Sequence, residues 1–240
     1  MISHKHKCIF VHIPKTAGMS IENSFLRSLG LQFYQGQCPP LLLSFNKDKK
    51  VGPPSLAHLT PEQYLEYSYI SKELFDNYFK FAFVRNPWAR AVSIYKYFKY
   101  HRILSFEGFM KYRFPKLWEE RYDFVRPQVD FLYDAHGKQQ VDFIGKFEKL
   151  KEDFEFVRNN VSHPLEDLLH INKPPRPHNW YSRWNRRFIY AELRQRPHLI
   201  KHLNLFSPVW SNYRDYYSPE ALQIVEEHYR KDIDLLKYKC

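Results

Sequence analysis

Two short apolar runs, each followed at once by a helical pattern, limit the fold more than any other feature of this sequence. Residues 8–13 (CIFVHI) are rich in β-forming side chains and stop at Pro14, after which residues 20–29 repeat apolar side chains at helical spacing. Residues 79–85 and the helical pattern over 88–101 repeat this order. Each pair predicts a buried strand that leads through a tight turn into a helix.

Weaker patterns continue the alternation of strands and helices. We predict brief strands at 55–58 and 141–144, and helices that begin at Thr60–Pro61, cover 149–159 and cover 219–231. Such alternation is typical of an α/β fold with a mostly parallel central sheet flanked by helices. A chain of 240 residues suits a single domain over 1–240.

The overall charge limits the class of partner. A formal net charge of +11 favours anions such as nucleotides, acidic sugars, nucleic acid or a membrane surface. The three scattered cysteines, Cys8, Cys38 and Cys240, fit neither a zinc pattern nor a disulfide framework and favour a reducing, cytoplasmic location. No run reaches the ~20 apolar residues of a bilayer span, so we expect no stable membrane insertion.

The segment 14–20 (PKTAGMS) follows the first predicted strand and has the features of an anion-binding loop. The first N–H groups of a helix have no intrahelical partners and lie at the positive end of its dipole, so they bind an anion readily. Lys15 adds a charge, Gly18 permits a close backbone approach, and Thr16 and Ser20 supply hydroxyls. The lysine precedes the glycine, unlike in nucleotide triphosphatases. Alone, the segment also fits a turn followed by a capped helix.

A second anion site is predicted where the strand 79–85 ends. Arg85 would lie at the carboxyl end of this strand, where parallel α/β sheets place ligands, and Ser93 follows about two helical turns later. An arginine fork with a hydroxyl suits a phosphate monoester. Alone, the arginine could equally cap or pair at a helix start. Two such junctions together suit a nucleotide that carries anions at both ends.

Both segments resemble those of sulfotransferases that use 3′-phosphoadenosine-5′-phosphosulfate (PAPS). The likeness is greatest to the carbohydrate group that includes heparan sulfate 2-O-sulfotransferase and related bacterial enzymes. Residues 11–20 and 81–93 carry the resemblance, and residues 126–132, 141–148 and 229–233 resemble later parts of the family. The resemblance implies a P-loop-like sulfotransferase fold. It also implies metal-free transfer of a sulfuryl group from PAPS to an acceptor hydroxyl, with a glycan preferred, leaving adenosine 3′,5′-bisphosphate.

The resemblance also assigns residues to the donor. In the family the first loop holds the 5′-phosphosulfate, which here implies Lys15, Thr16, Ala17, Gly18, Met19 and Ser20. The lysine also stabilises the leaving oxygen, so Lys15 is a predicted catalytic residue. Arg85 and Ser93 match the family's 3′-phosphate ligands. Lys173, which precedes a run of prolines, resembles a segment that folds over the donor.

A histidine is the predicted base that removes the acceptor's proton. Neutral imidazole suits this step near pH 7, and His58 lies between the two donor segments, where the 2-O-sulfotransferase group has its base. A buried histidine bonded to backbone is the alternative. In related 3-O- and N-sulfotransferases the base is a carboxylate on the first helix. Asn23 occupies that place here, and Glu22 is rotated from it by ~100°. We interpret His12 as structural or supporting.

The acceptor side is predicted from further resemblance and from residue type. Arg126 and Gln128 are acceptor candidates by resemblance, and the interleaved arginines and tryptophans after Lys173 suggest Arg176 and Trp180. Guanidinium groups and aromatic rings suit an acidic saccharide. They would also suit single-stranded nucleic acid, and the tryptophans could simply anchor a segment to the core. Residues 172–212 are the predicted acceptor-side insertion.

Two other functions fit parts of the sequence. An ATP-dependent phosphotransferase would need Mg²⁺ carboxylates close to the loop, and we find no suitable aspartate after a strand. A non-catalytic polyanion-binding module would not need His58 beside Lys15 and Arg85. We therefore prefer sulfuryl transfer to a glycan hydroxyl over both, and over nucleic-acid binding.

Overall fold

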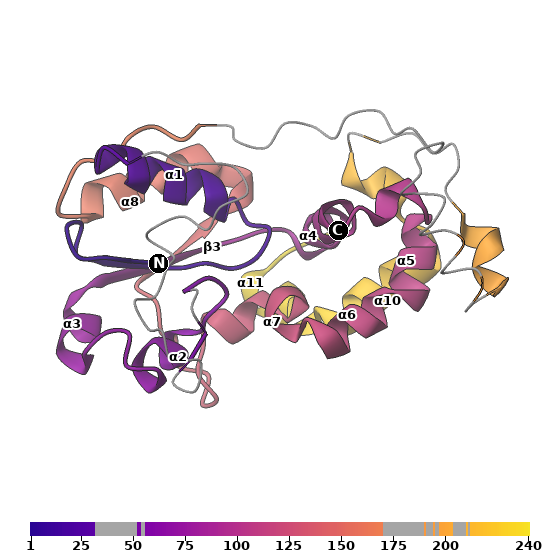
Figure 1. The fold of residues 1–240 in the computed structure, drawn as a ribbon, viewed down its shortest axis with the longest axis horizontal. Helices are drawn as coiled ribbons and strands as arrows, with labels where there is room; N and C mark the ends of the chain where they lie inside the picture. The colour runs from indigo at the N-terminus through magenta and orange to yellow at the C-terminus, as the bar shows by residue number, and fades with distance from the viewer. Residues whose placement is uncertain are drawn as a thin grey trace. The chain divides into compact units, whose positions relative to one another are not determined.

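The computed structural model describes residues 1–31, 52–53, 56–169, 190, 194, 197–203, 210 and 212–240. The chain forms two compact units (Figure 1), one of Met1–Arg85 with Arg126–Asn172 and one of Asn86–Val125 with Lys173–Cys240. Each unit is built from two separate segments. The single domain over 1–240 stays a prediction, as does the insertion at 172–212, most of which lies outside the described residues.

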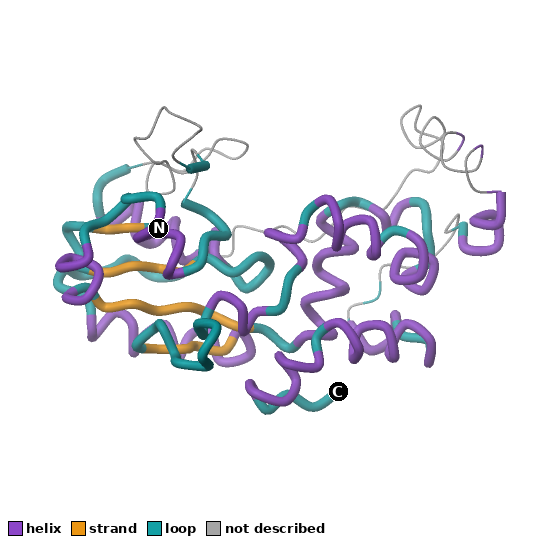
Figure 2. Tube along the Cα trace, turned by 90° about the horizontal axis from the view of Figure 1, so that it is seen from below, coloured by secondary structure: helices purple, strands orange, loops and turns teal. Residues whose placement is uncertain are grey.

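The first unit contains a four-stranded sheet in the order β1-β2-β3-β4. The strands are β1 (Ile2–Ser3), β2 (Cys8–Val11), β3 (Phe79–Val84) and β4 (Phe143–Lys146). β2, β3 and β4 are parallel, and β1 pairs antiparallel with β2. Figure 2 shows the strands side by side in orange. The mostly parallel sheet flanked by helices is confirmed.

One predicted strand is wrong. Residues 57 and 58 form a turn and Leu56 is in no strand, and His58 has a φ of 63°, in the left-handed region that a strand cannot contain. Ser55 lies outside the described residues. The strand predicted at 141–144 is confirmed with a shift of two residues, as β4.

Helices cover the sheet of the first unit on both faces (Figure 1). They are α1 (Gly18–Ser28) and α8 (Leu150–Asn160) on one face, and α2 (Pro61–Glu66) and α3 (Lys72–Asn77) on the other. Side chains of α1 and α8 form one core cluster with fully buried rings of the sheet, among them Phe10, Phe81 and Phe83. Gly145 of β4 makes room for this cluster, because an added Cβ would lie 2.5 Å from the ring of Phe83.

Helices form most of the described part of the second unit. Its α-helices are α4 (Pro87–Tyr97), α5 (Phe106–Tyr112), α6 (Phe114–Glu120), α7 (Tyr122–Val125), α10 (Pro219–His228) and α11 (Arg230–Leu236). As predicted, Asn86 caps α4, its side chain accepting a 3.1 Å hydrogen bond from the Ala89 N–H. The helix predicted over 219–231 is broken at Tyr229, whose buried hydroxyl donates to the Val125 carbonyl at 2.6 Å.

Short 3₁₀-helices complete the described secondary structure. Those of the first unit are η3 (Gln128–Phe131) and η4 (Phe147–Lys149), and those of the second are η2 (Tyr100–Arg102), η5 (Pro197–His202) and η6 (Tyr213–Tyr216). Over the part of the chain that the structure describes, no helix has the length and apolar character needed to cross a bilayer.

Candidate functional site

The loop between β2 and α1 has the backbone of an anion-binding turn. Lys15 and Ala17 both have left-handed conformations, with φ of 71° and 77°. The buried Thr16 hydroxyl donates to the Ile13 carbonyl at 2.9 Å and so ties the loop to itself. Alternating backbone conformations of this kind direct successive N–H groups toward one point. The helix α1 (Gly18–Ser28) is described throughout. Its first turn holds no acidic residue, and no side chain caps its N-terminus.

Arg85 brings the second predicted anion site to this loop. It follows β3 directly, and its Nη1 donates a long hydrogen bond of 3.4 Å to the Lys15 carbonyl. Its guanidinium also lies 4.1 Å above the centre of the Phe147 ring. Burial, and after it the charge of Arg85, lowers the pKa of Lys15 to about 8. An anion placed here would relieve the repulsion between these two cations.

Gln128 holds the backbone of Arg85 in place. Its Oε1 accepts from the Arg85 N–H at 2.8 Å, and its Nε2 donates to the Arg85 carbonyl at 2.8 Å. The side chain is fully buried. These bonds extend the hydrogen bonding of β3 by one residue. The acceptor contact predicted for Gln128 stays a prediction, and in the structure both ends of its amide bind the backbone of Arg85.

Replacing Gln128 by leucine should therefore destabilise the fold. Leucine removes a hydrogen bond from the N–H and one from the carbonyl of Arg85, both partly buried, at about 1–3 kcal/mol each. We expect the free energy of unfolding, measured by urea denaturation, to fall by about 2–4 kcal/mol. Gln223→Leu is the matched control, since this exposed side chain of α10 bonds to Glu227 and should change stability by less than about 0.5 kcal/mol. Equal effects of the two variants would contradict the role of Gln128.

The turn that carries His58 is held by Arg126. Arg126 Nη2 donates to the His58 carbonyl at 3.4 Å, and its guanidinium lies 4.0 Å above the centre of the Phe131 ring. The acceptor contact predicted for Arg126 stays a prediction. In the structure this side chain reaches the backbone of the predicted base.

His12 and Glu22 join His58 in a cluster that the sequence analysis did not predict. His12 Nδ1 lies 2.5 Å from Glu22 Oε1, and both side chains are buried. The ring of His12 meets that of His58 edge to face, with centroids 5.3 Å apart. One signal was available in the sequence. Glu22 is four residues after Gly18 and so lies on the same face of α1, the face that His12 contacts.

His12 explains why a glycine stands at the start of α1. A Cβ built on Gly18 would lie 2.1 Å from His12 Nε2, far inside van der Waals contact. The predicted reason was a close approach of backbone to ligand. The structure adds a steric reason, because the imidazole occupies the place of the missing side chain.

The remaining predicted residues are placed as follows. Ala17, Met19 and Ser20 are partly exposed at the loop and first turn of α1, and Ser93 is partly exposed on α4 of the second unit. Lys173, Arg176 and Trp180 lie outside the described residues.

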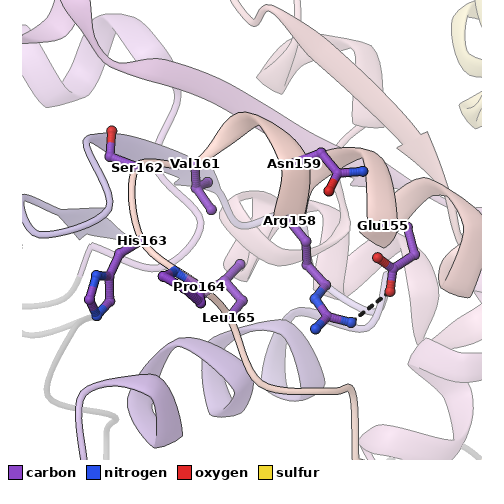
Figure 3. A pocket seen from close by; sticks show the side chains of 8 residues that line it. All are labelled: Glu155, Arg158, Asn159, Val161, Ser162, His163, Pro164 and Leu165. Carbon is purple, nitrogen blue, oxygen red and sulfur yellow. Dashed lines mark hydrogen bonds and ion pairs between the residues drawn. The ribbon is translucent and has the colours of Figure 1, made fainter.

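A separate pocket lies at the C-terminal end of α8 (Figure 3). It has a volume of about 310 Å³ and is lined by residues between Glu155 and Leu165. Its arginine, Arg158, pairs with Glu155 at 2.6 Å and with Asp167 at 2.8 Å. The charge of Arg158 is therefore already balanced by two carboxylates. None of the predicted site residues lines this pocket.

Comparison with known proteins gives the chain a family. A model described as the sulfotransferase family matches residues 1–239. An uncharacterized protein of Archaeoglobus fulgidus is 35% identical over 115 residues, which cover 43% of this chain and 83% of that protein. No solved structure matches the chain significantly. The matched region includes the Lys15 loop, Arg85 and the histidine cluster, and the chain belongs to the sulfotransferase family.

Proposed function

We propose that this chain transfers a sulfuryl group from PAPS to a hydroxyl of an acidic carbohydrate. Sulfuryl transfer in general follows from the family. The donor and the acceptor are our proposal. The observation that supports the donor best is the contact of Arg85 with the Lys15 loop, 3.4 Å from Nη1 to the carbonyl. It puts two cations and the uncapped start of α1 at one edge of the sheet.

The residues present suit a nucleotide with phosphate groups at both ends. We assign the 5′-phosphosulfate to Lys15, the Thr16 to Ser20 segment and the first N–H groups of α1, which favour an anion through charge and dipole. We assign the 3′-phosphate to Arg85 and Ser93. Arg85 is suited to this because Gln128 fixes its backbone at 2.8 Å and a guanidinium fork matches phosphate geometry. Lys173 would add a further contact.

The chemistry needs a proton acceptor and a stabilised leaving group. Bound PAPS supplies an activated sulfuryl group on a phosphate oxygen. His58 takes the proton of the acceptor hydroxyl as its oxygen forms a bond to sulfur. Lys15 stabilises the negative charge on the phosphate oxygen as its bond to sulfur breaks. The hydrogen bond from the Arg126 guanidinium to the His58 carbonyl holds the turn of His58 during this step.

The protonation state of the Lys15 side chain predicts how nucleotide affinity depends on pH. An anion binds the ammonium form, and the pKa of Lys15 is lowered to about 8 by burial and Arg85. The affinity should therefore be highest below this pKa and fall as the pH rises through it. We expect up to about a tenfold loss for adenosine 3′,5′-bisphosphate from about pH 7 to about pH 9, measured by calorimetry. Lys15→Arg keeps its charge over this range and should remove the slope. An unchanged slope would show that another group titrates.

The acceptor is assigned on charge and residue type. The net charge of +11 and the guanidinium groups of Arg126 and Arg176 would attract carboxylate or sulfate groups, and Trp180 would stack on a sugar face. Transfer of labelled sulfate from PAPS to a panel of glycans, phenols, tyrosyl peptides and lipids tests the proposal. We expect acidic glycans to be labelled. Labelling confined to another class would overturn the acceptor, and no labelling of any class would overturn the activity.

A reducing location is part of the same proposal. Cys8 and Cys240 are free thiols, and burial raises the pKa of the Cys8 thiol to about 12, which makes it unreactive. We therefore propose that the enzyme works in the cytoplasm.

A further inference from the structure

Glu22 is a buried carboxylate in an unusual position for a structural residue. Its side chain is fully buried in α1, and neither of its oxygens has a conventional hydrogen bond among the described residues. Its close contact is with His12 Nδ1, 2.5 Å from Oε1. Burying a carboxylate with so few partners costs several kcal/mol. In proteins generally, replacing a buried charged pair by apolar side chains of similar size is often neutral or stabilising.

The contacts of His12 show where the charge of Glu22 acts. The ring of His12 has Glu22 at Nδ1, Gly18 at its Nε2 edge and His58 against it, with ring centroids 5.3 Å apart. The imidazole of His12 therefore contacts both the buried carboxylate and the predicted base. The ring of His12 also stacks with that of Phe10, with centroids 5.6 Å apart. These contacts leave His12 little freedom to turn.

Other titratable groups surround the pair. Glu22 adds to the effect of burial in raising the pKa of the Tyr64 hydroxyl, and it opposes the burial that lowers the pKa of the Met1 amino group to about 5. On other elements, Met1 and Tyr64 interact electrostatically with Glu22, His58 lies against His12, and Arg126 donates a hydrogen bond to the His58 carbonyl.

We propose that Glu22 and His12 are positioning residues for His58. The carboxylate of Glu22 fixes the orientation of the His12 ring through the close contact between Oε1 and Nδ1, and the paired ring holds the imidazole of His58 edge to face. This proposal rests on the role of His58 as the base. It goes beyond that role by giving the base a buried counter-charge.

The pair would act when His58 becomes charged. As the acceptor oxygen bonds to sulfur, its proton passes to His58, and the resulting imidazolium lies next to the ring that Glu22 holds. A negative charge in a buried setting stabilises a nearby imidazolium more than water would. The proton stays on His58 until it is lost to solvent. Glu22 and His12 exchange no proton with the acceptor.

Glu22→Gln tests this proposal. The amide keeps the size and an oxygen acceptor for His12 but removes the charge. We expect turnover with PAPS to fall about tenfold to a hundredfold, and the acidic limb of turnover against pH to move to lower pH, because His58 loses a counter-charge. Affinity for adenosine 3′,5′-bisphosphate should stay within about threefold. This retained affinity would also show that the variant is folded. Glu22→Asp should keep the pH profile and recover part of the turnover.

Glu166→Gln is the matched control. Glu166 is half exposed and pairs with Arg27 near the other end of α1, at 3.0 Å, so this variant should change neither turnover nor pH profile. If Glu22→Gln keeps both turnover and pH profile while His58 variants lose activity, the positioning role is wrong and the proposed function stands. If His58 variants retain full turnover, the base assignment has failed instead. A loss of turnover in Glu22→Gln with an unmoved pH profile would also overturn the proposal.

Discussion

Replacing His58 by asparagine should lower the turnover of sulfuryl transfer by two to four orders of magnitude, the usual contribution of a general base. Asparagine is the better test residue, since it tolerates the left-handed backbone of this position, with its φ of 63°. His58→Ala should give a loss of similar size. The affinity for adenosine 3′,5′-bisphosphate should stay within about threefold, because the proposed donor contacts come from Lys15 and Arg85.

The control for this variant is His136→Asn. His136 is an exposed loop residue of the same unit, and its replacement should leave turnover unchanged. Steady-state rates at saturating donor and several pH values would measure both variants. Wild-type turnover in His58→Asn would exclude His58 as the base.

Replacing Gly18 by alanine should weaken nucleotide binding by roughly fivefold to a hundredfold. The new Cβ would lie 2.1 Å from His12 Nε2, so either the ring or the loop must move. Overpacking of this kind costs about 1–3 kcal/mol, and here the cost falls on the start of α1, where the donor is proposed to bind. Calorimetry with adenosine 3′,5′-bisphosphate would measure the loss.

A second substitution distinguishes a clash with His12 from a close approach of the nucleotide as the reason for Gly18. His12→Ala removes the ring that the new methyl group meets, so the double variant Gly18→Ala, His12→Ala should recover most of the binding. If instead the glycine is needed for a close approach of the nucleotide, the double variant will bind as weakly as Gly18→Ala alone. Full binding by Gly18→Ala would contradict both reasons.

Short sequence patterns predict those strand and helix boundaries that depend on neighbouring residues alone. The β-rich run before Pro14 and the cap of Asn86 before Pro87 each place a strand or helix boundary without help from the rest of the chain, and β2 and α4 are confirmed there. Tyr229 shows the limit. Its helical pattern continues, but a buried tertiary hydrogen bond at 2.6 Å fixes its side chain where the helix breaks.

The site was predictable in part for a similar reason. Lys15 and Arg85 each follow a strand. Because the carboxyl ends of parallel strands lie at the same edge of a sheet, the topology predicts that these two residues lie close together. The sequence does not predict the contact of Glu22 with His12, because the rotation of ~100° per residue gives the face of α1 on which Glu22 lies but not the side chain that it meets there. The sequence predicts an acceptor contact for Gln128, and nothing in it shows that the amide also binds the backbone of Arg85.

Calorimetric titration of adenosine 3′,5′-bisphosphate into the intact chain tests the central claim, that one nucleotide is held at both ends by the Lys15 loop and Arg85. We predict saturable binding of one nucleotide per chain that weakens at least about tenfold in Lys15→Met and in Arg85→Met, a loss of about 1.4 kcal/mol or more each. Lys72→Met, at an exposed lysine of α3 that pairs with Asp76, should bind as the wild type does. Absence of binding, or unchanged binding in both site variants, would contradict the account.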